Sequence, residues 1–294
     1  MQDFRMDTFL AVCEYMNFTK AAQNLGLTQP AISQHIHFLE KEYGAKLFTM
    51  NGRKVQLTAA GRLLKNAALT IRHDEMHLKH KMHQTTDEER EYHFGATLTV
   101  ADYIFGPGLI KFQKLHPQSH ISLYVANTKE LLEKIESGQL DFAIIEGYFP
   151  KEEYESYLYR NEPYIPVCAK NRSSAFQKKD MTELLNQTLI VREQGSGTRK
   201  ILEKILEEHN FSLYDFKNLL EIGSLSVIKE LVAADCGISF LYRAAAKKEL
   251  EEGILETFLP SGWDYSHNMT FIFRKGSVFR DEYEKIFREI QRLG

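Results

Sequence analysis

Glycines and small hydroxylated residues gather at a point where the sequence predicts that a strand ends and a helix begins. Residues 194–199 read Gln-Gly-Ser-Gly-Thr-Arg, between an apolar run at 188–191 and a helical pattern at 198–208. Glycines let a ligand approach the backbone, and the first N–H groups of a helix have no partner within that helix. Such a junction can bind an anion, either a carboxylate or an oxyanion of sulfur or phosphorus.

Other predicted junctions between strands and helices carry similar chemistry. Hydroxyl groups lie at or after the ends of the strands predicted at 92–98 and 120–125, and a Gly-Ser pair opens the helix predicted at 224–234. Ligands of open α/β sheets bind beyond the carboxyl ends of the strands, so we expect these residues to line one site. The candidate ligand-binding residues are Thr97, Leu98, Thr99, Thr128, Glu146, Gly147, Gly195, Ser196, Gly197, Thr198, Gly223 and Ser224.

Each of these junctions also has a plainer interpretation. Ser and Thr before a helix commonly act only as caps, and a pair of glycines commonly forms a turn. The carboxylate of Glu146 would oppose a bound anion, so we expect it to bind a cationic part of the ligand or to pair with Arg199. The convergence of several junctions on one site favours ligand binding.

A second group of polar residues lies on a helix predicted at 28–42. Thr28 can cap its N-terminus, and Pro30 falls in the first turn, where a missing N–H is tolerated. Helical spacing predicts an inward apolar face made of Ala31, Ile32, Phe38 and Leu39. The outward face carries Gln29, Ser33, Gln34 and His37. Short polar side chains on a helix that fits the major groove can match base edges, although a solvated face has the same pattern.

The preceding segments are suited to support such a recognition helix. A first helix is predicted at 4–15, and a short second helix at 20–25 is expected to be capped by Thr19. Gly26 makes a tight turn into the helix at 28–42. Two helices joined by a turn in this way are typical of a helix-turn-helix.

The segment after the recognition helix has the pattern of a β-hairpin. Strands are predicted at 47–50 and 54–57 on either side of Asn51-Gly52, which is a strong hairpin signal. A hairpin at this place is typical of a wing. It would place Arg53 and Lys54 near the DNA backbone or the minor groove.

The formal net charge of −3 is unevenly distributed. Residues 1–90 carry 12 Lys and Arg against 10 Asp and Glu, and the remainder carries 25 against 30. A DNA-binding surface needs only a local positive patch. The basic residues expected around the recognition helix are Lys20, Lys41, Lys46, Arg53 and Lys54.

The three cysteines, Cys13, Cys168 and Cys236, are isolated in the sequence. Without a CxxC pair, neither a disulfide framework nor a thiolate zinc site is indicated, and a reduced, cytoplasmic setting is expected. No apolar run approaches the roughly 18 residues that a membrane-spanning helix needs. We expect no targeting segment and no membrane partner.

The motifs of common enzyme sites are missing. The GSGTRK segment lacks the GxxxxGK[ST] spacing of a P-loop, no GxGxxG opens a helix after the first strand, and no GxSxG occurs. Ser196 has no assigned base or acid. We therefore expect a protein that is not an enzyme and that needs no cofactor.

Four histidines, His73, His77, His80 and His83, lie along one flank of a long helix predicted at 59–85. The i, i+4 spacing of the first two could chelate a metal, but no acidic or thiolate partner is fixed nearby in the sequence. A polar flank explains them equally well, so we assign no metal site.

The run FLAVCEYMNFTKAAQNLGLTQPAISQHIHFLEKEYGAKLF, followed by LTAAGRLL, resembles the winged helix-turn-helix of the LysR-type transcriptional regulators. The resemblance implies that Gln29, Pro30, Ser33 and Gln34 lie at the DNA groove and that Arg53 lies in the wing. The chain departs from the family at Gln34, His37 and Met50, where basic residues are common. These departures weaken the expected phosphate contacts.

The long helix at 59–85 begins after a potential cap, Thr58. Its narrow apolar stripe is made of Ala60, Leu64, Ala67, Ile71, Leu78 and Met82, close to heptad spacing. In the resembled family the corresponding linker helix pairs with its twin, which implies a homodimer or a homotetramer. The alternative is packing onto the chain's own second half. A polar hinge is expected at 85–91.

The rest of the chain alternates strands and helices, which predicts an α/β fold with parallel sheets covered by helices. Strands are expected near 92–98, 120–125, 141–145, 164–169, 188–191, 218–222, 237–240 and 268–274. Helices are expected near 107–115, 128–137, 198–208, 224–234, 244–250 and 278–292. The resemblance implies an effector-binding domain with two lobes, similar to periplasmic binding proteins, and effector contacts near Thr97, Thr99, Thr128 and the loop 196–198.

The predicted organisation has three parts. A winged helix-turn-helix occupies 1–58, a linker helix and hinge 59–90, and an effector-binding domain 91–294, with lobe I at 91–162 and 264–294 and lobe II at 163–263. The expected partners are double-stranded DNA, a small anionic effector, a second copy of the chain and RNA polymerase. The alternative is a cytoplasmic small-molecule-binding or carrier protein whose N-terminal segment only dimerises, but such a protein has no use for a wing.

Overall fold

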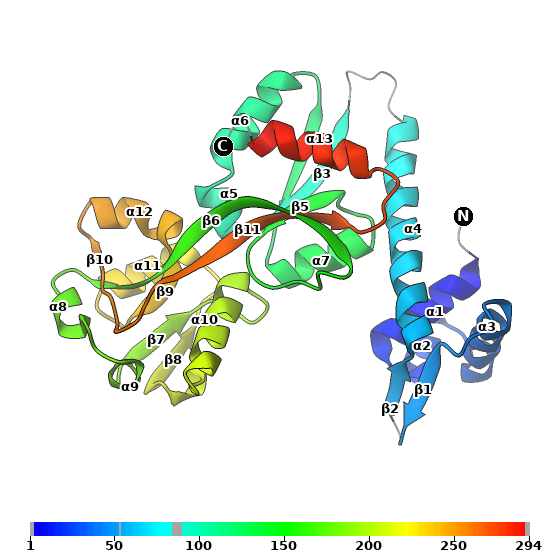
Figure 1. Cartoon of the computed structure of the whole chain (residues 1–294), viewed down its shortest axis with the longest axis horizontal. Coiled ribbons are helices and arrows are strands. Elements are labelled where there is room, and N and C mark those ends of the chain that lie inside the picture. The colour runs from blue at the N-terminus through cyan, green and yellow to red at the C-terminus, as the bar shows by residue number, and fades with distance from the viewer. Residues whose placement is uncertain (1–2, 53, 84–89, 292–294) are drawn as a thin grey trace.

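The computed structural model describes residues 3–52, 54–83 and 90–291. Figure 1 shows a small helical head with a β-hairpin at one end of a long helix, α4, and a larger α/β body beside the other end. The elements of the head are α1 (Phe4–Tyr15), α2 (Phe18–Leu25), α3 (Gln29–Glu42), β1 (Phe48–Asn51) and β2 (Lys54–Leu57). α4 (Ala59–His83) follows them.

Local capping explains where the helices of the head begin. The Thr28 hydroxyl accepts a hydrogen bond from the Ala31 N–H at 3.3 Å, as expected for the cap of α3. The expected cap of α2 was wrong, because Asn17 and not Thr19 occupies that place and accepts from the Lys20 N–H at 3.0 Å. α2 therefore begins at Phe18, which lets that ring contact Phe48 of the hairpin.

The buried face of α3 includes Ile36, which was not predicted, whereas the predicted Ala31 is only half-buried and Phe38 is exposed. Ile32, Ile36 and Leu39 are buried in the core of the head, but Phe38 is 44% exposed. The guanidinium of Arg5 in α1 lies over the Phe38 ring at 3.9 Å. A cation over an aromatic ring is favourable at the surface, so this residue needs no place in the core.

The body contains the remaining elements of the fold. Its first half is β3 (Glu91–Ala96), α5 (Leu98–Tyr103), α6 (Gly106–Leu115), β4 (His120–Val125), α7 (Thr128–Glu136), β5 (Phe142–Ile145) and β6 (Tyr154–Ala169). Lobe II is then built from α8 (Ser173–Phe176), α9 (Met181–Leu184), β7 (Thr188–Val191), α10 (Gly197–Glu208), η1 (Leu213–Asp215), β8 (Asn218–Glu221), α11 (Leu225–Ala233), β9 (Ser239–Tyr242), α12 (Arg243–Glu251) and β10 (Leu255–Thr257). The chain returns to lobe I through β11 (Tyr265–Arg274) and α13 (Arg280–Gln291).

The expectation of purely parallel sheets was wrong. β3 pairs in parallel with β4 and β5, and β7 with β8, but β11 pairs antiparallel with both β5 and β6. The largest sheet has the order β10-β6-β11-β5-β3-β4, and β9 also pairs with β6. β6 and β11 therefore run side by side through both lobes and join them (Figure 1).

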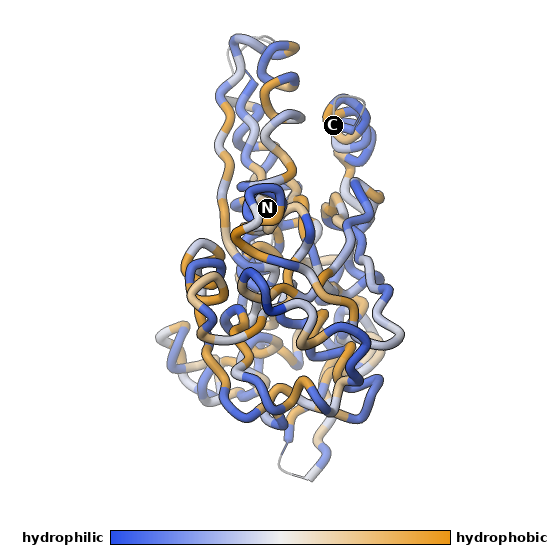
Figure 2. Tube along the Cα trace, turned by 90° about the vertical axis from the view of Figure 1, so that its left-hand side faces the viewer, coloured by the Kyte–Doolittle hydropathy of each residue, from blue (hydrophilic) through white to orange (hydrophobic). Residues whose placement is uncertain are grey.

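The main core of the body extends through both lobes. It includes Phe94 and Phe142 of lobe I and Leu189 and Ile238 of lobe II. Hydrophobic and hydrophilic segments alternate along the body, as helices and strands with one buried side require (Figure 2). Among the residues that the structure describes, no helix combines the length and the apolar character needed to cross a bilayer.

α4 uses one side to pack on lobe I and leaves another side exposed. His73 and His77 are buried against lobe I, so the interpretation of these histidines as a solvated polar flank was wrong. They meet Asp141, which is distant in sequence and was not visible as a partner. Several apolar side chains of α4 remain exposed, namely Leu63, Ile71, Leu78 and Met82. The hinge expected at 85–91 lies largely outside the described residues.

Candidate nucleic-acid interface and interlobe site

The outward face of α3 presents polar side chains that no other described element covers. Gln29, Gln34 and His37 are exposed and Ser33 is half-buried. The Gln29 side chain donates to the Ser33 hydroxyl at 3.0 Å, which orders two of the candidate groups relative to each other. Pro30 is exposed in the first turn of the helix, where it was expected. This face offers donors and acceptors at the spacing of a helix that can enter a major groove.

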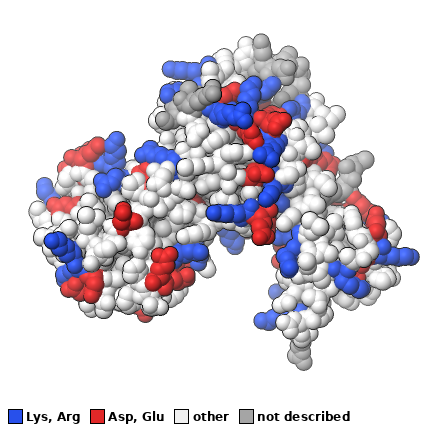
Figure 3. Space-filling view, in the orientation of Figure 1, with Lys and Arg blue, Asp and Glu red and all other residues white. Residues whose placement is uncertain are grey.

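The charges around this face are mixed in sign. Figure 3 shows Lys and Arg side chains on the head, with Asp and Glu among them. Lys20, Lys41 and Lys54 are exposed, whereas Lys46 pairs with Glu40 at 2.6 Å. The predicted wing contact Arg53 lies outside the described residues. The basic groups are thus placed beside α3 and in the hairpin, where phosphates of a bound duplex would lie.

The candidate residues of the two lobes meet at one place. Thr128 of lobe I donates to the backbone oxygen of Glu146 at 2.7 Å, and Thr198 of lobe II donates to Glu146 Oε1 at 2.6 Å. Gly147 and Gly197 face each other so closely that a Cβ on Gly147 would lie 2.8 Å from the Gly197 Cα. Only glycine allows this approach of the two backbones.

Glu146 is fully buried at this contact, with 1% of its surface exposed. Burial raises the pKa of Glu146, although the Thr198 hydrogen bond and the charge of Arg192 act in the opposite direction. The expected pairing with Arg199 was wrong, because that guanidinium turns away and pairs with Glu203 and Glu221. The Glu146 carboxylate is therefore held at the interlobe contact by Thr198 and not by Arg199.

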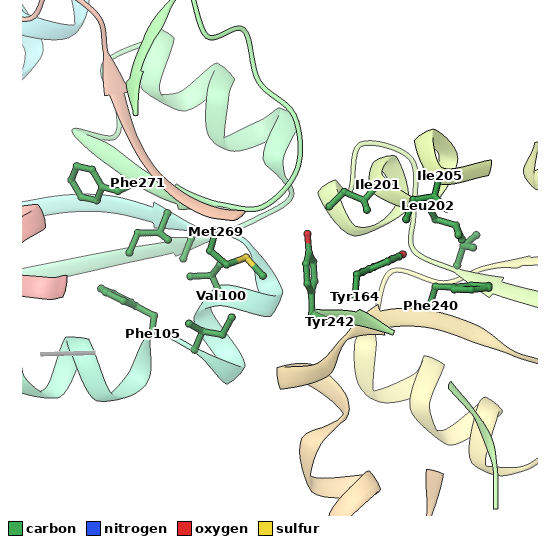
Figure 4. Packing of buried hydrophobic residues seen from close by; sticks show 14 of the residues in the cluster. Val100, Phe105, Tyr164, Ile201, Leu202, Ile205, Phe240, Tyr242, Met269 and Phe271 are labelled. Carbon is green, nitrogen blue, oxygen red and sulfur yellow. The ribbon is translucent and has the colours of Figure 1, made fainter. Parts of the chain in front are cut away.

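Four buried hydroxyl groups near this contact have no hydrogen-bond partner among the described residues. They belong to Thr97, Thr99, Ser196 and Tyr242, and the Oε2 atom of Glu146 is unpaired as well. Tyr242 lies between Val100 and Met269 on one side and α10 on the other (Figure 4). Buried polar groups are normally paired, so these unpaired hydroxyls from both lobes make the contact a candidate for binding a polar group.

The junction between β3 and α5 differs in detail from its prediction. β3 ends at Ala96, and Leu98 and Thr99 lie in the first turn of α5 instead of at a strand end. The sequence from Thr97 contains β-branched residues that favoured a longer strand. Thr97 is the N-cap of this short helix, yet its side chain makes no capping hydrogen bond.

The remaining candidates lie at the starts of α10 and α11. Gly195 has a positive φ of 97°, which allows the turn before α10. Gly223 precedes the N-cap residue Ser224, whose hydroxyl accepts from the Val227 N–H at 3.5 Å. Ser224 therefore acts at least in part as the cap that its plainer interpretation predicted.

An open groove of about 580 Å³ lies at the outer edge of the interlobe contact. Among the residues that line it are Thr128, Gly195, Ser196, Gly197 and Arg199. Sequence reasoning missed two nearby residues, Tyr242 and the buried Arg192. Arg192 directly follows the apolar run of β7, but its burial becomes known only from the fold.

Family models match both parts of the chain. The model described as "Bacterial regulatory helix-turn-helix protein, lysR family" matches residues 5–62, and the "LysR substrate binding domain" model matches residues 85–291. The chain belongs to the LysR family of transcriptional regulators. It is a transcriptional regulator with an effector-binding domain, and the family consists of regulators and not of enzymes.

Relatives along the full length agree with this family. The chain is 30% identical to the transcriptional regulator CysL of Bacillus subtilis over 83% of this chain and 82% of CysL. It is 31% identical to the regulator CbbR of Rhodospirillum rubrum over 92% of this chain and 90% of CbbR. The match extends through both the head and the body.

Solved structures share the fold of this regulator. Full-length OxyR of Pseudomonas aeruginosa matches with a TM-score of 0.59 at 20% identity, covering 100% of this chain and 96% of OxyR. The regulatory domain of CcmR from Synechocystis, solved in complex with 2-PG, matches with a TM-score of 0.60 at 20% identity, covering 69% of this chain and 98% of that domain. The predicted architecture of a winged helix-turn-helix, a linker helix and a two-lobed α/β domain is confirmed.

Proposed function

We propose that this regulator binds promoter DNA through α3 and its wing, as a dimer, under the control of a small oxyanion bound between the lobes. The observation that carries the proposal is the set of buried, unpaired hydroxyl groups that both lobes contribute beside Glu146. The proposed boundaries are residues 1–58 for DNA binding, 59–90 for the linker and 91–294 for effector binding.

Dimerisation follows from the exposed apolar side of α4. Leu63 and Met82 are 74% and 76% exposed, and Ile71 and Leu78 lie between them. An apolar stripe on a helix is stabilised when a second helix covers it. Two α3 helices related by a twofold axis would then contact two half-sites of a pseudo-palindromic operator.

The effector class follows from the chemistry of the interlobe contact. Hydroxyl groups can donate hydrogen bonds, and the N-terminus of a helix such as α10 favours negative charge, so the two together favour an oxygen-rich anion. A relative of the same fold, CcmR, is described in complex with 2-PG. From CcmR we take only that a protein of this fold can bind a small molecule. That the effector of this chain is an anion is inferred from the chain's own residues.

A single buried strand connects the effector site to the linker helix. β5 ends at Ile145, next to Glu146, and begins at Phe142, next to Asp141. Asp141 Oδ1 contacts His77 Nδ1 at 2.6 Å, and the Asp141 backbone oxygen contacts His73 Nε2 at 3.0 Å. A ligand that favours one arrangement of the lobes can therefore shift α4 through β5, provided that its affinity for the two arrangements differs.

The DNA-binding part is tested by a mobility shift with promoter DNA at stated salt. Lys54→Ala should weaken binding for all sequences, whereas Lys217→Ala, on an exposed surface of lobe II, should bind as the wild type does. The absence of sequence-preferring binding would contradict the DNA-binding proposal.

The effector part is tested by thermal unfolding in the presence of small anions, because a ligand of the folded state raises its stability. Thr198→Val removes the hydroxyl at Glu146 and should abolish stabilisation by an active anion. Thr182→Val, an exposed residue of α9, is the matched control. Equal stabilisation of both variants would contradict an effector site between the lobes.

A further inference from the structure

Arg192 is a buried cation whose hydrogen bonds are incomplete. It directly follows β7 and is 3% exposed. Its Nε and Nη2 atoms donate to the carboxylate of Glu193 at 2.8 and 2.9 Å. Its Nη1 atom is buried without a partner among the described residues. A guanidinium that served only packing would be expected to have all its buried donors paired.

Glu193 holds the two remaining nitrogens in the fork geometry that a bound anion would use. Unlike Arg192, its side chain is 29% exposed. Its backbone oxygen accepts from the Ser196 N–H at 3.2 Å, within the turn that leads to α10. The carboxylate thus contacts a buried cation from a position that solvent can reach.

The Glu193 carboxylate lies close to the segment that leads into α11. Its Oε2 atom lies 3.8 Å from the point where a side chain on Gly223 would begin, next to the start of α11. Gly223 directly precedes Ser224, the N-cap of the nine-residue helix α11, so the carboxylate lies near a helix N-terminus. The charge of Arg192 also reaches Glu146, the residue at which the two lobes meet.

We propose that Glu193 is an internal competitor that occupies the anion subsite of Arg192 and that the oxyanion of the effector displaces it. The proposal rests on the proposed function, since it assigns the charged end of the effector to the interlobe site. In the displaced state the oxyanion accepts from the Arg192 fork, and the Glu193 carboxylate moves into solvent. Nη1 then provides a further donor for the bound molecule.

Displacement of Glu193 also gives ligand binding a mechanical consequence. Glu193 and Gly195 belong to the turn closed by the hydrogen bond from the Ser196 N–H to the Glu193 backbone oxygen, and Gly197, which follows this turn, touches Gly147 of lobe I. Part of the proposal is that release of the Glu193 side chain allows this turn to move. Binding at Arg192 would then alter the contact between the lobes directly.

The test measures sulfate binding by titration calorimetry with the full-length chain at constant ionic strength. Sulfate is a probe for the oxyanion class and not the presumed effector. Glu193→Gln keeps the size of the side chain but removes the competing charge, so it should bind sulfate roughly tenfold more tightly than the wild type. Arg192→Lys loses the fork and should bind roughly tenfold more weakly.

Two matched controls carry the same chemical changes elsewhere in lobe II. Glu207→Gln on the exposed side of α10 and Arg172→Lys at the surface should bind sulfate as the wild type does. Circular dichroism verifies that each variant is folded. If Arg192→Lys does not fold, Glu193→Gln alone tests the proposal. Its sulfate binding should become tighter only if Glu193 competes with sulfate for Arg192.

The outcomes distinguish the competitor role of Glu193 from the broader proposal that an effector binds between the lobes. Unchanged or weaker sulfate binding by Glu193→Gln overturns the competitor role, as does a failure of both wild type and Glu193→Gln to bind sulfate up to about 100 mM. If anions still stabilise the wild type and Thr198→Val abolishes this, the effector site stands without Arg192. If sulfate binding follows the expected order but Thr198→Val has no effect, the Arg192 subsite stands and effector control at Glu146 fails.

Discussion

The docking of α4 on lobe I should depend on a charged histidine. Burial alone would lower the pKa of His77, but hydrogen bonds and charges from Asp141 and Glu282 raise it to about 9, from a usual value of 6.5. His77 Nδ1 lies 2.6 Å from Asp141 Oδ1, and Nε2 lies 3.8 Å from Glu282 Oε2. Lys81 of the same helix also pairs with Glu282 at 2.6 Å, and the rings of Phe279 and Tyr283 cover His77.

The size of this contribution follows from the pKa of His77. Each unit of pKa difference between folded and unfolded states corresponds to about 1.4 kcal/mol, so a pKa near 9 gives about 3 kcal/mol. A raised pKa stabilises the fold fully below the unfolded value of 6.5, and this stabilisation is lost as the pH rises through about 9. Removal of one partner from a buried ion pair lowers the unfolding free energy by a similar amount, roughly 3 kcal/mol.

Urea unfolding of the wild type and of His77→Gln between about pH 6 and about pH 10 measures the effect. The wild type should lose about 3 kcal/mol of unfolding free energy over this range relative to the variant. His120→Gln, an exposed histidine at the start of β4, should follow the wild type. If the curves of wild type and His77→Gln run parallel, His77 is not the charged group that holds α4.

Three further predictions concern the head, the interlobe contact and the cysteines. Ser33→Ala should relax the sequence preference of DNA binding with a smaller loss of overall affinity, which competition with mutated operators would measure; an unchanged preference would remove Ser33 from base contact. Gly197→Ala places a Cβ 2.8 Å from both Glu146 Cγ and Thr128 Oγ1. It should lower the unfolding free energy by about 1 to 3 kcal/mol, and a variant as stable as the wild type would contradict the close contact. Burial raises the pKa of Cys13 and of Cys168 to about 12, whereas Cys236 is exposed. A thiol reagent should therefore modify Cys236 quickly in the native protein and the other two only on unfolding, and equal rates would disagree with this assignment.

Elements with local signals were predictable from the sequence. α1 (Phe4–Tyr15), β4 (His120–Val125) and β7 (Thr188–Val191) have the predicted limits, because caps, turns and hydrophobic periods act within a few residues. The first half of β6 was missed, since its alternation of half-buried and exposed residues is explained only by pairing with β11. That pairing joins residues about a hundred positions apart, and no local pattern encodes it.

The same distinction applies to the site residues. The glycines at 195 and 197 were visible because backbone freedom is a property of the residue itself. The partners of charged groups could not be predicted from the sequence, since Arg199 contacts Glu221 and His77 contacts Asp141 only in the folded chain. Arg192 was missed for the same reason, because an arginine after a strand is ordinary until its burial is known.

The closeness of Gly147 to Gly197 limits how an effector can act. The two backbones already touch, and a Cβ added to Gly147 would lie 2.8 Å from the Gly197 Cα, so no ligand atom can be inserted at this point without separating the lobes. A bound molecule must therefore occupy the space beside this contact, where the unpaired hydroxyl groups lie, or move the turn that carries Gly197. Either way the free energy for rearranging the lobes comes from the difference in ligand affinity between the two arrangements. Because β5 leads from Glu146 to Asp141, the same rearrangement acts on the residue that holds α4, and thereby on the spacing of two recognition helices in a dimer.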